Sequence, residues 1–384
     1  MSTASINPGL SPAGSGGGGG SGPRILLVPP ELRLAAAMRL IGTQTEDPRG
    51  AAERFLQAAS DHRIDLSLMY CSQDPGAPDE VREVCLAVLG TGRTAMVFVS
   101  GPRKESSWMH GARLTRRAGL VGAGEQSERV GLIHRVCEAA AAVRTAEKPP
   151  PVLAQTLLET RESEVARAFR VAGFLQLGDL AYMRRPVQRE PGRLLELAAS
   201  PTWPAGLAVR SVAELGASGE DEAAVRSRLL GALERSYIGT RDCPELCGMR
   251  SLEDVLDSHR SVGVMDPTLW WLVESRDGPQ GCLLLSPAPE QDSVELVYLG
   301  LAPAVRGIGL GATLLGFGLR RLYDTALAPE AVSGHPHVRG TGGVTCAVDT
   351  RNAPAMKLYR RAGFERVGLR MPFVRALPSG EARP

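Results

Sequence analysis

A repeat within the chain limits its possible folds more than any other pattern. Residues 154–174 and 344–364 align at an offset of 190 and share a Thr-Arg pair, a later arginine and an Ala-Gly-Phe motif. The matched pairs are Thr160 with Thr350, Arg161 with Arg351, Arg170 with Arg360 and Phe174 with Phe364. Each copy predicts a short apolar strand, a polar turn, an amphipathic helix ended by a glycine, and a further strand. The sequence therefore predicts two related domains in tandem.

Two stretches that cannot form a core set the expected domain boundaries. A Gly/Ser run at 15–22 predicts a flexible tail over 1–24. Pro191, Pro201 and Pro204 interrupt residues 187–204, which predicts a linker. The first domain is therefore expected at 25–186 and the second at 205–384, and a length of 384 residues fits two domains.

Charge and cysteine usage exclude several classes of protein. With 43% apolar residues and 22% charged residues, the chain has material for buried cores. A net charge of +2 provides no broad field for nucleic acid or an anionic membrane, so neither is expected as a partner. No stretch has the pattern of a secretory signal or a membrane span. Seven scattered cysteines favour a reduced, cytoplasmic protein.

No metal site is expected. Cys243 and Cys247 are close in sequence, as are His335 and His337, but neither pair has further ligands nearby to complete a coordination shell. We therefore interpret both pairs as ordinary loop residues.

The second half has a clear order of predicted elements. Spacing and capping residues predict strands and helices, with Ser251 opening one helix through a capping box. The expected elements are a strand at 207–211, a helix at 221–238, a helix from 252, a hairpin of 270–274 and 280–286, a strand at 294–301, a helix at 309–327 and a strand at 344–349.

A glycine-rich turn joins the strand at 294–301 to the helix that follows. Its sequence is Arg306-Gly-Ile-Gly-Leu-Gly311. Glycines there let backbone N–H groups turn toward an anion, and the helix N-terminus adds positive potential. The sequence is neither a Walker A loop nor a dinucleotide-binding loop in its expected context. The turn indicates a phosphate site, although a tight turn alone also fits.

The order and spacing of the segments around this turn resemble the GNAT superfamily of N-acetyltransferases. The resemblance rests on strand 295–301, the Arg306-x-x-Gly309-x-Gly311 loop, strand 344–349 and the helix that carries Asn352, Tyr359 and Gly363-Phe364. It covers roughly 207–374, and 25–186 only through its last strand and helix. It implies an α/β (α+β) fold of two tandem GNAT-like domains, each a mixed, mainly antiparallel twisted sheet flanked by helices. The tandem arrangement is similar to that of two-domain family members.

The resemblance also implies how acetyl-CoA is held. In the family, the glycine loop holds the pyrophosphate and the preceding strand pairs with the pantetheine arm. Carried over, the expected cofactor contacts are Leu299, Gly300, Leu301, Arg306, Gly307, Ile308, Gly309, Leu310, Gly311, Ala312 and Asn352. Arg306 also fits a surface cation, and Asn352 also fits a helix cap.

Two residues are expected to carry the chemistry. Tyr359 falls where the family places a phenol that protonates the departing thiolate, although an aromatic there also fits core packing. Attack by an amine requires a base, because an ammonium must first lose a proton. Glu295 resembles the strand glutamate that serves as base in the histone acetyltransferase branch, but it also fits a structural charge. Asp349 is the reserve base and also fits a helix cap.

The turn at 239–250 is where this family usually shapes the acceptor pocket. Arg241, Asp242 and Glu245 lie there and either contact a charged acceptor or are simply solvated. The first domain departs from the family pattern, because Phe169 falls where Tyr359 does and no complete glycine loop follows the strand at 96–100. We expect the first domain to have lost cofactor binding.

These observations lead to one functional expectation and one alternative. The chain is expected to be an acetyl-CoA-dependent N-acetyltransferase, acting without a metal, whose acceptor is a primary amine of a small molecule or peptide. The acceptor would attack the thioester directly, and the protein would be a monomer or homodimer. The alternative is a non-catalytic, acyl-CoA-binding regulatory protein that keeps the loop but has lost turnover.

Overall fold

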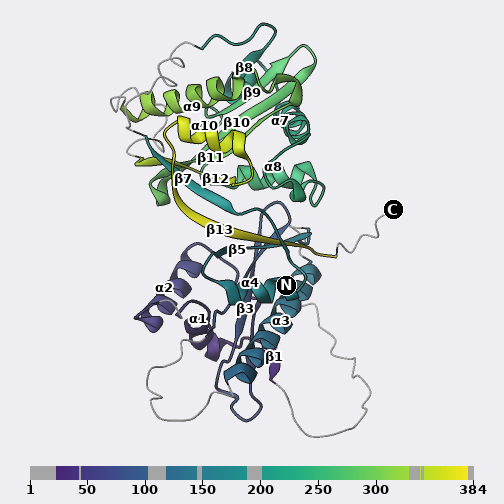
Figure 1. The fold of residues 1–384 in the computed structure, drawn as a ribbon, viewed down its shortest axis with the longest axis vertical. Coiled ribbons are helices and arrows are strands. Elements are labelled where there is room, and N and C mark those ends of the chain that lie inside the picture. Colours follow the sequence, from purple (N-terminus) through teal and green to yellow (C-terminus); the bar gives the residue numbers. More distant parts are fainter. Residues whose placement is uncertain are drawn as a thin grey trace, which may run out of the picture.

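The computed structural model describes residues 23–42, 45–102, 118–144, 149–187, 201–327, 338 and 341–378, with the side chains of 118–123 excluded. The predicted tail, most of the predicted linker, and His335 and His337 lie outside these residues. Two halves lie one above the other, the first in purple to blue and the second in green to yellow (Figure 1).

The first half is a sheet with helices on it. Its strands are β1 (Arg24–Leu27), β2 (Met69–Gln73), β3 (Val84–Gly90), β4 (Thr94–Val99), β5 (Leu153–Glu159), β6 (Leu175–Gln176) and β7 (Leu180–Pro186). Its α-helices are α1 (Arg33–Ile41), α2 (Pro48–Asp61), α3 (Ala118–Ala142) and α4 (Ser163–Val171), with a 3-10 turn η1 (Pro30–Leu32).

The second half repeats this order of elements. Its strands are β8 (Ala208–Ser211), β9 (Trp270–Ser275), β10 (Gly278–Ala288), β11 (Ser293–Leu301), β12 (Gly343–Asp349) and β13 (Glu365–Ala376). Its α-helices are α6 (Val212–Ala217), α7 (Glu222–Tyr237), α8 (Leu252–Arg260), α9 (Leu310–Leu327) and α10 (Ala353–Arg361). Short 3-10 turns are η3 (Pro244–Leu246), η4 (Pro289–Gln291) and η5 (Pro303–Val305).

Local sequence signals account for these helices and strands. Asp221 accepts the backbone N–H of Ala224 at the start of α7, and Ser251 accepts that of Asp254 at the start of α8, as N-caps do. Trp270 and Trp271 point to opposite faces of β9 and are both buried, in two different cores. The elements predicted for the second half are confirmed, and α6 is an additional short helix.

The halves exchange strands within one continuous sheet. The order is β1-β2-β3-β4-β5-β13-β7-β12-β11-β10-β9-β8, and β6 pairs with β13. The last strand of the chain, β13, thus lies between β5 and β7 of the first half. In return β7 lies between β13 and β12, and Figure 1 shows the yellow β13 running down from the upper half into the lower one. The mixed, mainly antiparallel sheet predicted from the sequence is confirmed.

The exchange carries side chains across the predicted domain boundary. Ala181 and Met183 of β7 are buried in the core beneath α9, which belongs to the second half. Met371 and Phe373 of β13 are buried in the core of the first half. A cut at residue 186 therefore does not separate two complete cores, because each half completes the other.

Among the described residues, none of the helices has the length and apolarity needed to cross a bilayer.

Candidate active site

A cleft opens where two parallel strands separate. β11 and β12 pair only at their starts, where Ser293, Val294 and Glu295 face Gly343, Val344 and Thr345. Beyond this point β11 has a β-bulge: Leu284 and Leu285 of β10 pair with Tyr298 and Leu296, and Val297 is left between them. The bulge turns β11 away from β12 and leaves a cavity of about 550 Å³ between the strands.

Most of the predicted cofactor residues line this cleft. The structure brings together Leu299, Gly300, Leu301, Arg306, Gly307, Gly311, Asn352 and Tyr359. The predicted residues that do not line it are Glu295, Ile308, Gly309, Leu310 and Ala312. Leu310 is instead buried in the core under α9, while Ile308 is 57% exposed. The cleft therefore gathers the strand end, the loop and α10, as the sequence predicts.

The glycine loop has the backbone conformation that its sequence indicates. Gly307 and Gly309 have φ values of 81° and 85°, a region that L side chains rarely adopt. No atom lies within 4 Å of the position where a Cβ would project from either glycine. The first amides of α9 follow directly, and a helix N-terminus leaves such N–H groups without partners in the helix. The loop is therefore an open cradle of N–H groups at the end of the cleft.

Arg306 links the loop to the helix on the other side of the cleft. Its Nε donates to the carbonyl of Leu301 at 2.8 Å, and its Nη2 donates to that of Ser236 at 2.8 Å. Its Nη1 donates to the carbonyl of Gly239 at 3.3 Å. Carbonyl groups hold the guanidinium without neutralising it, so the mouth of the cleft keeps a positive charge.

Tyr359 lies on α10 with its ring in the core and one side on the cleft. The residue is 7% exposed, and its ring packs 5.6 Å from that of Phe364. Burial raises the pKa of the phenol well above its usual value, so the hydroxyl stays protonated at neutral pH. Tyr359 is thus compatible with both interpretations of the sequence. Its ring packs in the core, and its side chain also borders the cavity where a catalytic phenol would act.

Glu295 occupies the opposite face of the sheet from the α9 core. Val294 and Leu296 point into that core, so Glu295 between them points away, toward the α7 and α8 side. Thr345 of β12 is its partner across the strand pair, and Arg184 of β7 follows in the same row. Burial raises the pKa of the Glu295 carboxyl. The exchanged strand β7 therefore completes the face on which Glu295 lies.

Asp349 and Asn352 have structural partners. Burial alone would raise the pKa of Asp349, yet hydrogen bonds from Arg351 and the N–H of Cys243 hold it below its ordinary value. Arg351 Nη2 lies 2.7 Å from the carboxylate, and Cys243 N donates to it at 3.1 Å. Asn352 caps α10, accepting the N–H of Ala355 at 3.3 Å. Asp349 thus holds a loop in place, which argues against its role as reserve base.

Asp242 lies in the cleft wall, and the sequence contains no decisive signal for it. Its Oδ1 accepts the backbone N–H of Asp349 at 2.9 Å, and the side chain of Asn352 also hydrogen-bonds to it. The residue as a whole is exposed and lines the cleft, with protein around its carboxyl group. Burial, and next to it the charge of Asp349, raise the pKa of the carboxyl. The only sequence-based indication for Asp242 was its location in the turn at 239–250, where the family usually shapes the acceptor pocket.

The first half lacks both candidate catalytic residues at the matching positions. β4 and β5 repeat the parallel pairing of β11 and β12, and Met96 stands where Glu295 stands. Phe169 takes the place of Tyr359 and is fully buried against Phe174 and Phe373. β3 and β4 pair without a register shift, so the bulge at Val297 has no counterpart there. Residues 103–117, where a glycine loop would fall, lie outside the described residues.

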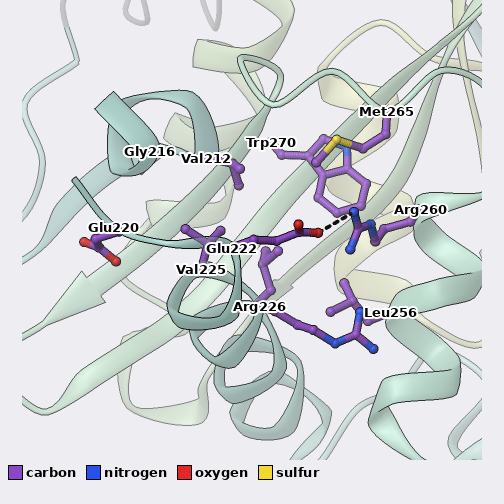
Figure 2. A pocket seen from close by; sticks show the side chains of 11 residues that line it. Val212, Gly216, Glu220, Glu222, Val225, Arg226, Leu256, Arg260, Met265 and Trp270 are labelled. Carbon is purple, nitrogen blue, oxygen red and sulfur yellow. Dashed lines mark hydrogen bonds and ion pairs between the residues drawn. The ribbon is translucent and has the colours of Figure 1, made fainter. Parts of the chain in front are cut away.

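A second, smaller cavity lies between α6, α7 and α8. It measures about 310 Å³ and is lined mainly by aliphatic side chains and Trp270. Figure 2 shows Glu222 and Arg260 joined across it, 3.1 Å apart. Arg226 also has a partner, Asp257, at 2.9 Å. Since its charged residues are already paired, this cavity does not offer the converging free polar groups of a reaction site.

In the part of the chain that the structure describes, no three His, Cys, Asp or Glu residues gather as metal ligands would. Cys243 is buried and Cys247 is exposed, and neither forms a disulfide.

Comparisons with known proteins agree with this geometry. The chain is 29% identical over 177 residues to a mycothiol acetyltransferase of Beutenbergia cavernae, covering 42% of this chain and 54% of that protein. It is 31% identical over 194 residues to a mycothiol acetyltransferase of Thermomonospora curvata, covering 50% and 54%. The chain thus spans about half the length of the curated relatives it matches. No family model matches it.

A solved structure has the same fold. It is the GCN5-related glucosamine N-acetyltransferase region of a fungal multi-domain GH3 β-N-acetylglucosaminidase, with a TM-score of 0.50 and 10% identity, covering 92% of this chain and 38% of that one. The chain therefore has the GNAT fold, and part of it is similar in sequence to the two acetyltransferases. The chain has two GNAT-like halves in tandem, and they share one sheet.

Proposed function

We propose that the chain is an N-acetyltransferase that uses acetyl-CoA and acetylates a primary amine by direct attack on the thioester. The observation that carries the proposal is the cleft at the bulge of β11. It has an open glycine cradle and a cationic mouth at one end, and the protonated phenol of Tyr359 along its side.

The residues present fit acetyl-CoA. A pyrophosphate is an anion that accepts hydrogen bonds, and the loop offers glycine N–H groups, open space and the charge of Arg306. The edge of β11 from Leu299 to Leu301 has lost its pairing with β12, so its backbone groups are available to an extended amide chain. When bound, acetyl-CoA supplies an activated acetyl thioester.

Two residues of the chain carry out the two proton transfers. Glu295 accepts a proton from the acceptor ammonium, directly or through water, because burial holds its pKa nearer to neutral. Tyr359 donates its hydroxyl proton to the departing thiolate. Tyr182 of β7 lies on the Glu295 face, with Arg370 5.9 Å from its ring centroid. The acceptor is therefore received on a face built by both halves.

The relatives suggest an acceptor to test first. They are named mycothiol acetyltransferases. A panel should contain the unacetylated form of mycothiol, an aminoglycoside, amino acids and peptides with free N-termini, with thiol release as the readout. Turnover with any of these amines supports the enzyme. Acetyl-CoA binding without turnover on any amine favours the non-catalytic regulatory protein.

Gly309→Val is expected to weaken acetyl-CoA binding about ten- to a hundredfold, since a branched residue at positive φ costs about 1–3 kcal/mol and would reshape the loop. Calorimetric titration with acetyl-CoA measures this. Ile308→Val is the matched control, because Ile308 is 57% exposed beside it. Equal affinity of a folded Gly309→Val variant would show that the loop is only a turn.

Glu295→Gln is expected to lower kcat/KM about a hundredfold at neutral pH, the lower end of general-base effects, because some free amine reacts unaided. In the unmodified protein, activity should fall as pH drops through the pKa of Glu295, which lies above its ordinary value. In the Glu295→Gln variant, the decrease in activity at low pH that follows the pKa of Glu295 should disappear. Its activity should recover toward high pH, where more of the amine is unprotonated. An unchanged pH profile would make Glu295 a structural charge.

A further inference from the structure

Asp242 has an unusual electrostatic position in the cleft. Its carboxylate lines the cavity together with Tyr359 and Tyr298. Among the described residues, no lysine, arginine or histidine forms an ion pair with it. The neighbouring carboxylates differ in this respect, because Arg351 bridges both Asp349 and Glu245 at 2.7 Å. Asp242 therefore presents to the cleft a carboxylate without a cationic partner in the described chain, and a cationic ligand bound beside it would form a charge-assisted hydrogen bond with it.

The carboxylate is held in place rather than free to turn away. Asp349 donates its backbone N–H to Asp242, while the Asp349 carboxylate accepts the N–H of Cys243, the next residue along. These reciprocal bonds fix the turn at 239–250 to the end of β12. Asn352, on α10, supplies a further hydrogen bond. Two donors leave lone pairs of the carboxylate available to the cavity.

We propose that Asp242 binds the ammonium group of the acceptor, so that the cleft selects protonated primary amines. This inference rests on the proposed function and assigns the group that recognises its substrate. Asp242 makes a charge-assisted hydrogen bond to the acceptor nitrogen and positions it. Glu295, which points to the α7 and α8 side of the sheet, takes the proton, directly or through water.

The competing ligand for Asp242 is the cofactor arm, which also passes through this cleft in the proposed function. That arm offers neutral amide N–H groups, which pair with a carboxylate without balancing its charge. An ammonium supplies both the hydrogen bonds and the charge. Arg306 lies in the same cleft and keeps its positive charge among carbonyl groups. The cleft thus has a cationic group for the pyrophosphate and an anionic group for the amine.

The test is Asp242→Asn, whose amide oxygen can still accept the Asp349 N–H. With the fastest amine of the panel, KM for the amine is expected to rise about 10- to 100-fold, the loss of one charge-assisted hydrogen bond. The kcat at saturating amine should change far less than KM. The dissociation constant of acetyl-CoA should stay within about twofold of its value in the unmodified protein, which is smaller than the roughly tenfold lower limit expected for the rise in KM. Glu245→Gln is the matched control, since Glu245 is on the same turn but bound to Arg351.

Each outcome is decisive. An unchanged KM for the amine in Asp242→Asn overturns the proposal while leaving the acetyltransferase intact. Equal weakening of acetyl-CoA binding also overturns it, since Asp242 would then be a cofactor contact. An equal rise of the amine KM in Glu245→Gln assigns the effect to the turn as a whole and overturns it too. If the unmodified protein acetylates no amine of the panel, the proposed function fails and this inference fails with it.

Discussion

A chain that ends at Phe364 is expected to unfold in both halves, although the deleted segment belongs to the second half in the sequence. The deletion removes β13, which pairs with β5 over seven residues and also with β7. It also removes Met371 and Phe373 from the core of the first half. Loss of one core phenylalanine side chain costs about 3–5 kcal/mol, and whole domains are stable by only about 5–15 kcal/mol. A central strand is therefore indispensable.

Circular dichroism during heating, with hydrogen exchange resolved for the first half, measures this effect. A chain ending at Pro378 is the control, because it keeps all of β13. Phe373→Ala provides a graded version that should remain folded but lose about 3–5 kcal/mol. Retention of cooperative melting and slow exchange in the first half of the short chain would show that the halves are independent.

Tyr359→Phe is expected to lower kcat about a hundred- to ten-thousandfold, the usual contribution of general acid catalysis. The ring keeps its packing against Phe364, so acetyl-CoA affinity should stay nearly constant. Single-turnover thiol release and calorimetry separate the two quantities. Tyr323→Phe on α9 is the control, since Tyr323 does not line the cleft.

Full activity of Tyr359→Phe across pH would reassign the phenol to packing alone. Water or another group would then protonate the thiolate. Phe169 shows that the matching helix of the first half accepts an aromatic ring without a hydroxyl. That ring is fully buried, whereas Tyr359 also borders a cavity, and this difference is why we expect the hydroxyl to matter.

The sequence predicted individual elements well because their signals are local. The apolar run at 294–301, the glycine turn and the caps at Asp221 and Ser251 all act within a few residues. The exchange of β7 and β13 has no such signal. β7 begins with the apolar run at 180–183 and β13 alternates apolar residues from Val367 to Phe373, but neither pattern states whether the partner strand is near or far along the chain. The predicted boundary at 186 therefore separates the two repeats in the sequence but does not separate the two hydrophobic cores.

The same distinction applies to the site. Gly307 and Gly309 were predicted because glycines at that spacing between a strand and a helix indicate phosphate binding, and Tyr359 was predicted because the resemblance to the GNAT superfamily implies a phenol there. Asp242 was only one of three charged residues in a turn. Its importance comes from contacts with Asp349 and Asn352, more than a hundred positions away in the chain. Burial and the charge of Asp349 raise the pKa of Asp242, whereas the hydrogen bonds from Asp349 and Asn352 lower it, and none of these contacts can be inferred from the neighbouring residues in the sequence.

The position of β13 has a consequence for how the protein is made. Ribosomes add about 5–20 residues per second, so β13 is synthesised roughly 10–40 seconds after β5, its neighbour in the sheet. During that interval the nascent first half has an open strand edge, a known hazard for aggregation and wrong pairing. A pairing between segments so distant in the chain also slows folding. The first half of the fold is thus completed by a strand that leaves the ribosome only after the other described elements of the second half.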